Sequence, residues 1–332
     1  MFGNREYKLL KMAKGAGEMA VNIVKERWTS KVAELTIGTG PNAVKVGGET
    51  TLPYLQFEGE LPNKSLVALE VFDMAPQDWP ELLTSAFADV LNDPVAWAKK
   101  CVELGAGAVA LRLMSAHPDW KNASGEEVAK TAKAVADAID VPLIVIGCGV
   151  EEKDGEILPV VADALSGKAC LIGCVTPENY KTITAAAIGA GHSLIASSPL
   201  DINLAKQLNI LLNEMAMPLD RIAIDPLVGA LGYGIEYAYS IMERARMGAL
   251  TGDKMLAMPI CSFVGQEAWK SKEAKDPDVA EWGPIHDRAI LWEAITASTF
   301  AVAGSSIMIM RHPEAMKLFY AWENEMRKSN AY

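Results

Sequence analysis

An aspartate and three glycines follow one apolar run of this sequence, where the run gives way to a helical pattern. The stretch is RIAIDPLVGALGYGI, in which Asp225 precedes Gly229, Gly232 and Gly234. A carboxylate at such a place can move a proton, bind a ligand, or accept hydrogen bonds from the following backbone amides. The glycines permit a close backbone approach or a positive φ. Residue types alone leave all three roles of Asp225 open.

Polar side chains also stand at the ends of the other apolar runs. They are Asp73, Arg112, His117, Asp119, Cys148, Thr176, Ser197, Ser198, Cys261, Ser262, Arg311 and His312. None of these runs contains a lysine, so Schiff-base chemistry lacks its nucleophile. The four histidines form no His-x-His pair, and the five cysteines lack the close spacing of an iron–sulfur motif. We therefore expect no metal site and no iron–sulfur cluster in this chain.

Two histidines precede a proline, in HPDW (117–120) and HPEA (312–315). Proline suits the first turn of a helix, so both motifs are typical of helix starts. For His117 that interpretation is at least as good as a ligand contact. For His312, which follows Arg311, we favour a ligand contact. The glycines of GCGVEEKDGE (147–156) indicate a turn rather than a phosphate loop, because acidic residues follow them.

Eight apolar runs must position these residues. They cover 65–73, 108–114, 142–148, 169–175, 193–199, 221–227, 255–263 and 306–312. Amphipathic windows alternate with them, at 93–104, 124–139, 201–216 and 313–328, and each opens on a residue suited to a helix start. Near-continuous apolar strands alternating with helices indicate a parallel sheet that is covered on both faces. Eight units favour a closed (β/α)8 TIM barrel, with an open doubly wound sheet as the alternative.

The first 62 residues fall outside this repeat. They contain an expected helix at about 5–27 and two short β runs, VAELTIG and AVKVGG, which we expect to plug or lengthen the bottom of the barrel. No Pro-, Gly- or Ser-rich linker divides the chain. We predict an N-terminal extension (1–62) packed on a barrel (63–332), together forming one structural domain.

Composition narrows the function classes. The formal charge of −11 offers no basic surface for nucleic acid. An odd number of unpatterned cysteines and the lack of a leader pattern favour a reduced, cytoplasmic protein. The longest uncharged window, TITAAAIGAGHSLIASSPL, is interrupted by Gly, His and Pro, so we interpret it as a helix and a buried strand rather than a membrane span.

Several longer motifs resemble a known family. They are DPLVGALGYGIEYAYSIMERARMGALTGD, EWGPIHDRAILWEAITASTFAVAGSSIMIMRHPEAMK, TIG, VGGETTLPY, FEGELPNKSLVALEVFD and IGCGVEEKDGE. The sequence is similar to the small subunit of the corrinoid iron–sulfur protein, the delta component of acetyl-CoA decarbonylase/synthase systems. The resemblance runs from about residue 30 to about residue 320, and the combination of motifs is far more specific than any one of them.

This resemblance implies a barrel subunit that pairs with a large subunit carrying a cobalamin-type corrinoid and a [4Fe–4S] cluster. The pair carries a methyl group from methyltetrahydrofolate, through a methyltransferase, to acetyl-CoA synthase/CO dehydrogenase in the reductive acetyl-CoA (Wood–Ljungdahl) pathway. The barrel mouth then supports one face of the corrinoid and excludes water, while the cofactor performs the chemistry. The resemblance implies no catalytic residue in this chain and no activity from it alone.

The residues that this role places against the corrinoid lie at the expected carboxyl ends of the strands. They are Asp73, Arg112, Thr176, Ser197, Ser198, Asp225, Gly229, Gly232, Ser262, Met310, Arg311 and His312. Methionines on the last two strands add a possible soft apolar bed at the mouth. Within this role we expect Asp225 to anchor backbone amides or a corrinoid amide rather than to move protons.

Two alternatives remain. A methyltetrahydrofolate:corrinoid methyltransferase, from the pterin-binding relatives of the barrel fold, would need Asp and Asn anchors on four strands. Here only the sixth strand has one, Asp225, while the third, fourth and seventh end in Cys148, Thr176 and Ser262. The other alternative is a scaffold barrel that binds no ligand.

Overall fold

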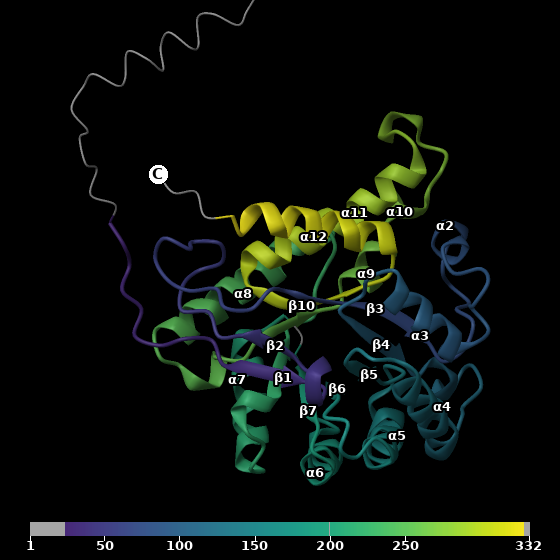
Figure 1. Ribbon diagram of the computed structural model, residues 1–332, viewed down its shortest axis with the longest axis horizontal. Helices are drawn as coiled ribbons and strands as arrows, with labels where there is room; N and C mark the ends of the chain where they lie inside the picture. Colours follow the sequence, from purple (N-terminus) through teal and green to yellow (C-terminus); the bar gives the residue numbers. More distant parts are fainter. Residues whose placement is uncertain (1–23, 199, 329–332) are drawn as a thin grey trace, which may run out of the picture.

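Eight parallel strands close into a barrel, in the order β10-β3-β4-β5-β6-β7-β8-β9. The computed structural model describes residues 24–198 and 200–328, and helices surround the barrel in Figure 1. The barrel strands are β3 (Leu66–Phe72), β4 (Ala108–Arg112), β5 (Leu143–Ile146), β6 (Leu171–Val175), β7 (Ser193–Ser197), β8 (Ile222–Asp225), β9 (Ile260–Ser262) and β10 (Ser305–Met310). The predicted (β/α)8 barrel is confirmed, and the open sheet is excluded.

Each of the eight predicted windows overlaps one barrel strand, and all but the last contain it whole, since β10 begins one residue before its window, at Ser305. The least accurate window is 255–263, where β9 begins only at Ile260. The carboxylate of Asp253 accepts a hydrogen bond from the backbone N–H of Met255 (3.1 Å), which stabilises a short 3-10 turn at Lys254–Leu256. Pro259, which has no N–H to donate to the sheet, separates that turn from β9.

Helices pack around the barrel, and their bounds are α2 (Glu81–Ser85), α3 (Pro94–Glu103), α4 (Gly125–Ala138), α5 (Glu151–Ala164), α6 (Tyr180–Ala190), α7 (Ile202–Glu214), α8 (Ile235–Leu250), α9 (Val264–Ala268), α10 (Lys272–Lys275), α11 (Ile285–Ala303) and α12 (Pro313–Met326). Four of these helices, α3, α4, α7 and α12, begin at a residue whose side chain accepts a backbone hydrogen bond in the first turn. Ser124 and Glu127 form a capping box at the start of α4. Asp93 and Asp201 accept backbone hydrogen bonds in the first turns of α3 and α7.

The acidic stretch after β5 starts a helix. The expected turn ends at Val150, and α5 begins directly at Glu151 with Glu151, Glu152 and Asp154 in its first turn. Carboxylates interact favourably with the positive end of a helix dipole, so the acids that argued against a helix start in the sequence stabilise it.

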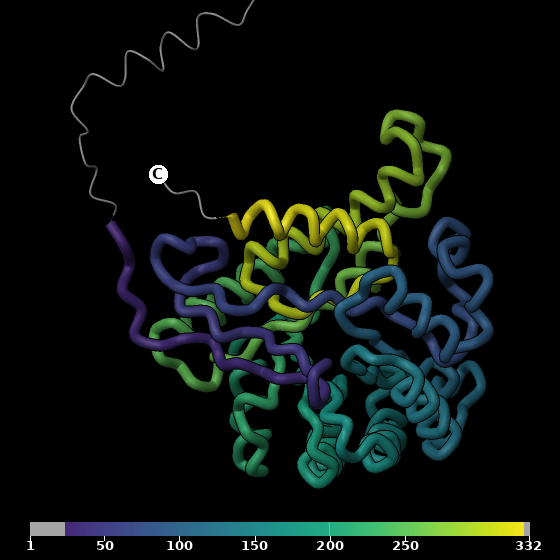
Figure 2. Tube along the Cα trace, in the orientation of Figure 1, coloured from purple at the N-terminus to yellow at the C-terminus, as the bar shows by residue number. Residues whose placement is uncertain are grey.

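A small hairpin occupies the amino-terminal end of the barrel. β1 (Glu34–Ile37) and β2 (Val44–Gly47) pair antiparallel, and Ile37 is fully buried in the apolar cluster that fills the barrel. The backbone N–H of Gly38 donates to the carbonyl of Ala169, just before β6 (2.8 Å). The purple trace of this segment crosses the centre of the view in Figure 2. The hairpin closes this end, so the opposite end is left as the mouth.

The helix expected at about 5–27 lies almost wholly outside the described residues. Residues 24–27, which the structure does describe, have no regular secondary structure. The uncharged window near residue 190 is confirmed as a helix and a buried strand, α6 and β7. No helix within 24–198 and 200–328 has the length and apolar character needed to cross a membrane.

Candidate functional site

A pocket of about 340 Å³ opens at the mouth, where the strands end. Its floor comes from the ends of β3, β4, β5 and β10, and its rim comes from α9, α10 and the loops after β3 and β4. The lining residues are Phe72, Asp78, Pro80, Arg112, Met114, Trp120, Cys148, Gly149, Gln266, Trp269, Lys270, Lys275 and Arg311. Two of the residues predicted from the sequence, Arg112 and Arg311, therefore line the same pocket.

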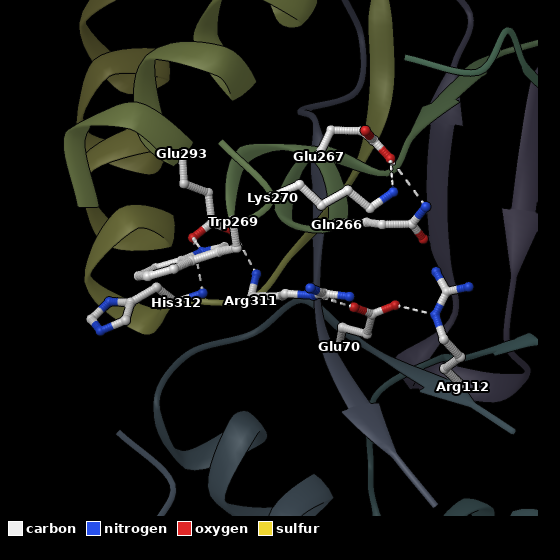
Figure 3. Close-up of polar contacts among 9 residues, drawn as sticks. All are labelled: Glu70, Arg112, Gln266, Glu267, Trp269, Lys270, Glu293, Arg311 and His312. Carbon is white, nitrogen blue, oxygen red and sulfur yellow. Dashed lines mark hydrogen bonds and ion pairs between the residues drawn. The ribbon is translucent and has the colours of Figure 1, made fainter. Parts of the chain in front are cut away.

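A single carboxylate joins these two arginines. Glu70 is fully buried on β3; its Oε1 accepts from Nε of Arg112 (2.5 Å) and its Oε2 from Nε of Arg311 (2.6 Å). Figure 3 shows Glu70 between the two guanidinium groups. Burial favours the protonated carboxyl, but the charges and hydrogen bonds of both arginines outweigh it and hold the pKa of Glu70 below its ordinary value. Glu70 therefore stays ionised and clamps β4 to β10 through β3.

Aromatic rings lie against both guanidinium groups. Arg112 lies over Phe263 (5.3 Å to the ring centroid), and Arg311 lies over Trp79 (4.8 Å) and Phe72 (5.6 Å). These contacts orient the planar cations and shield them from water. One nitrogen, Nη2 of Arg112, is buried and has no hydrogen-bond partner among the described residues.

A second buried carboxylate holds the end of β10. Glu293 on α11 accepts from the backbone N–H groups of Arg311 (2.5 Å) and His312 (3.0 Å) and from Nε1 of Trp269 (2.8 Å). Burial raises the pKa of Glu293 to about 7, against the effect of these hydrogen bonds. Gly265 makes this contact possible, since a Cβ there would lie 2.8 Å from Oε1 of Glu293.

His312 is the N-cap of α12. Its Nδ1 accepts from the backbone N–H of Glu314 (3.2 Å), and its ring stacks on Trp269 (5.8 Å between centroids). Figure 3 shows the ring pointing away from Glu70. Burial lowers the pKa of His312 to about 4, so the imidazole is neutral. His117 likewise accepts from the N–H of Asp119 (3.2 Å), which fits the helix-start interpretation of both motifs. The ligand role favoured for His312 stays a prediction.

Asp225 is fully buried beside Ser197 on the other half of the mouth. Its Oδ2 accepts from the Ser197 hydroxyl (2.5 Å) and its Oδ1 from the backbone N–H of Leu227 (3.0 Å). Burial raises the pKa of Asp225 to about 6. The carboxylate thus anchors the turn after β8, as expected, and it has no surface open to solvent.

Two hydroxyl groups on neighbouring strand ends lack partners. Thr176 follows β6 and Ser198 follows β7, and neither hydroxyl oxygen makes a hydrogen bond within the described part of the chain. Thr176 follows Cys174 by two residues, and Cys174 packs against the cluster that fills the barrel. Thr176 lies just beyond the carboxyl end of β6, at the mouth end of the barrel. Its hydroxyl oxygen is buried, and Thr176 is not among the residues that line the pocket.

Two of the predicted residues do not face the mouth, and a third is occupied by a turn. Ser262 bonds Ser305 (2.8 Å) and lies between Cys261 and Phe263, which belong to the interior cluster, so alternation points Ser262 toward the helices. Met310 belongs to the cluster between barrel and helices, as does Met308, and these two methionines provide no apolar bed at the mouth. Asp73 accepts from both the N–H (2.8 Å) and the hydroxyl of Ser115, and so fixes the turn after β4.

The glycines after β8 have the conformations that their residue type suggested. Gly232 and Gly234 adopt φ of 75° and 89°, and a Cβ on Gly229 would lie 2.4 Å from the carbonyl oxygen of Tyr233. They permit the tight connection to α8. Neither Gly229 nor Gly232 lines the pocket described above.

Glu70 and Glu293 are absent from the residues expected at the mouth, although they are its main organising groups. Each is the one charged residue of an otherwise uncharged stretch, LVALEVF for Glu70 and AILWEAITASTFAVA of α11 for Glu293. Lone charges of this kind are rarely buried unless they are paired, and that pattern could have identified both. Trp269, Lys270 and Lys275 lie after the end of the predicted strand at 255–263, and the sequence held no comparable signal for them.

The family model for the CO dehydrogenase/acetyl-CoA synthase delta subunit matches residues 34–323. Delta 1 of the acetyl-CoA decarbonylase/synthase complex from Methanosarcina thermophila is 34% identical over 304 residues, covering 87% of this chain and 69% of that protein. The delta subunits from Archaeoglobus fulgidus and Methanothermobacter thermautotrophicus are each 36% identical, over 88% of this chain and 68% and 75% of those proteins.

Among solved structures, dihydropteroate synthases share the architecture. The enzyme from Vibrio fischeri superimposes with a TM-score of 0.57 at 12% identity, covering 82% of this chain and 96% of that one. The Burkholderia cenocepacia enzyme complexed with 7,8-dihydropteroate gives 0.54 at 13% identity, over 90% and 98%. At these identities the likeness concerns the fold alone.

Proposed function

The chain belongs to the CO dehydrogenase/acetyl-CoA synthase delta subunit family, and from that premise we propose that its barrel mouth seats one face of a corrinoid that a partner subunit carries. As a delta subunit of an acetyl-CoA decarbonylase/synthase complex it has partner subunits. The proposed immediate partner is a large subunit that bears the corrinoid and a [4Fe–4S] cluster. A methyltransferase would deliver the methyl group of methyltetrahydrofolate to this pair, and acetyl-CoA synthase/CO dehydrogenase would receive it.

The state of the buried carboxylates at the mouth carries this proposal. Glu70, Asp225 and Glu293 are all fully buried, and each already accepts hydrogen bonds from neighbouring groups. A general acid or base must reach the reacting atoms. Carboxylates enclosed in this way position backbone and arginines instead, which favours a mouth that binds and shields over one that catalyses.

The groups that remain available match the periphery of a corrinoid. Its side-chain amides need both donors and acceptors. The Thr176 hydroxyl has no partner among the described residues, while Gln266 and Lys270 lie at the rim of the pocket. When bound, the corrinoid supplies the methyl-transfer chemistry. Thr176 and Gln266 would hold its amides, and Phe72 and Trp269 would keep water from its face.

Absorption spectroscopy of the corrinoid tests the proposal. The chain is mixed with the large subunit and with free corrinoid, separately and together, and methyltetrahydrofolate binding to the chain alone is measured in parallel. We expect the corrinoid bands to change only when this chain and the large subunit are both present. Binding of methyltetrahydrofolate by the isolated chain would support a methyltransferase, and unchanged spectra in every mixture would support a scaffold.

A further inference from the structure

The side chains that line the pocket at the mouth carry more positive than negative charge. Four cationic side chains line it, Arg112, Arg311, Lys270 and Lys275, and the acidic side chain in the lining is Asp78. Glu70 pairs with the two arginines and Glu267 pairs with Lys270, so the four positive charges meet three negative ones. One positive charge remains at the mouth of a chain whose formal charge is −11, which favours an anion in the pocket.

The floor of the pocket has more donors than acceptors. Glu70 provides two oxygens, and each is occupied by one arginine Nε. Nη2 of Arg112, a side chain only 8% exposed, is left without any acceptor in the described residues. A buried guanidinium nitrogen without an acceptor is costly, and an anion is the partner that satisfies it best.

The nearest other buried acids are already occupied. Asp154 accepts from the backbone N–H groups of Cys148 (2.7 Å) and Gly149 (3.0 Å). Asp225 accepts from Ser197 and Leu227. None of the described hydrogen bonds joins either of them to Arg112, so they do not replace the missing acceptor.

The rim of the pocket adds exposed positive charges and the flat apolar faces of aromatic rings. Lys270 and Lys275 are exposed; Lys270 pairs with Glu267 at the surface (2.7 Å), and Lys275 has no ion pair within the described residues. Figure 3 shows Lys270 and Gln266 close to Glu267, beside the Glu70–Arg112 pair. Trp120 and Trp269 supply aromatic walls, which suit a ring attached to the anion.

We propose that this pocket binds an oxyanion, a phosphate or carboxylate group borne by a small aromatic molecule, with Arg112 on its floor and Lys270 and Lys275 at its rim. Its volume of about 340 Å³ lies near the lower limit for small-molecule sites, so it takes a compact ligand or the anionic end of a larger one. The inference rests on the proposed function only in treating the mouth as a binding face.

Calorimetric titration of the whole chain tests this inference. The probes are inorganic phosphate and phenyl phosphate, at an ionic strength held constant with sodium chloride. We expect saturable binding of one phosphate per chain, with phenyl phosphate about tenfold tighter because its ring contacts the tryptophans. The double variant Lys270→Gln/Lys275→Gln should bind both probes about tenfold more weakly, since it loses two charge-assisted contacts.

The lysines are exposed, so the double variant should fold, and its melting temperature verifies this. Lys133→Gln, an exposed lysine on α4 far from the mouth, is the matched control and should bind as the wild type does. No saturable phosphate binding by the wild type, or equal binding by the double variant, overturns the inference. If phosphate fails to bind while the corrinoid spectrum still changes with the large subunit, the proposed anion site is wrong and the proposed function is supported.

Discussion

Oε1 of Glu70 lies 2.5 Å from Nε of Arg112, which is on the neighbouring strand, two residues beyond Ala110, the register partner of Glu70. This ion pair, completed by Arg311 on the other side, sets the floor of the mouth. It is buried, and removing one member of a buried pair leaves the other charge without compensation.

Glu70→Gln tests whether the Glu70 carboxylate, which joins Arg112 and Arg311, stabilises the protein. The change preserves size but leaves two buried guanidinium groups without a counter-charge, so we expect the free energy of unfolding to fall by about 3–5 kcal/mol. Urea denaturation measures it. Glu103→Gln, at an exposed position on α3, is the control and should change stability by less than about 0.5 kcal/mol. Equal effects from the two variants would show that Glu70 stabilises nothing.

Asp225→Asn should stabilise the protein at neutral pH. Asparagine can still accept from Leu227 and donate to Ser197. Burial raises the pKa of Asp225 from 3.8 to about 6, so between these values the folded protein keeps a proton that the unfolded chain releases. The wild type therefore loses stability relative to the variant as pH rises from about 4 to about 6, and the difference stays constant above that.

At pH 7 the expected gain for Asp225→Asn is on the order of 2 kcal/mol. Denaturation curves for both proteins from pH 4 to pH 8 measure the difference. A variant that is less stable than the wild type at pH 7 would mean that the folded state needs the ionised carboxylate, and that burial does not dominate at this position.

His312→Ala and His312→Asn separate capping from ligand binding. Asparagine caps helices well and alanine does not, so the alanine variant should be less stable than the asparagine variant by about 1 kcal/mol. Burial also lowers the pKa of His312 to about 4, whereas the unfolded chain is protonated below about 6.5. The wild type should therefore lose stability relative to His312→Asn as pH falls through that interval. Phosphate affinity should be the same in all three proteins, and a selective loss of it would support a ligand role.

Gly229→Ala should destabilise the protein by more than about 2 kcal/mol, because its Cβ would meet the Tyr233 carbonyl oxygen at 2.4 Å. Gly189→Ala is the control: it is helical, and a Cβ there meets nothing within 4 Å. That change should stabilise by up to about 1 kcal/mol. Thermal melts of both variants measure these effects, and a neutral Gly229→Ala would imply that the turn after β8 adapts easily.

The barrel could be predicted from sequence because its strands are buried on both faces. Such strands appear as separate apolar runs, and the helices between them begin at recognisable caps such as Ser124 and Asp201. The family followed from motifs distributed over most of the chain. The predicted strand boundaries were less accurate where a local turn takes the place of the strand, as the 3-10 turn around Met255 does before β9.

The direction in which the side chains at the mouth point could not be predicted from the sequence in the same way. A strand buried on both faces has no polar alternation to reveal which side chains point inward. Ser262 and Met310 were therefore expected at the mouth although they face the helices. Glu70 lay inside a strand rather than at its end, and Glu293 lay on a helix rather than on a strand. Closure of the barrel, which pairs β3 with β10, brings Glu70 beside Arg311, and the packing of α11 on β10 brings Glu293 there.

The corrinoid affinity of the complex formed with the large subunit tests the central claim most directly, when measured for Thr176→Val against Thr184→Val. Both hydroxyls are buried without a partner in the described residues, but Thr176 stands at the mouth and Thr184 on α6. Neither change should reduce stability, because valine replaces a hydroxyl that makes no hydrogen bond. We expect Thr176→Val to weaken corrinoid binding roughly five- to tenfold and Thr184→Val to leave it unchanged. Wild-type affinity in both variants would contradict the claim that the barrel mouth seats the corrinoid.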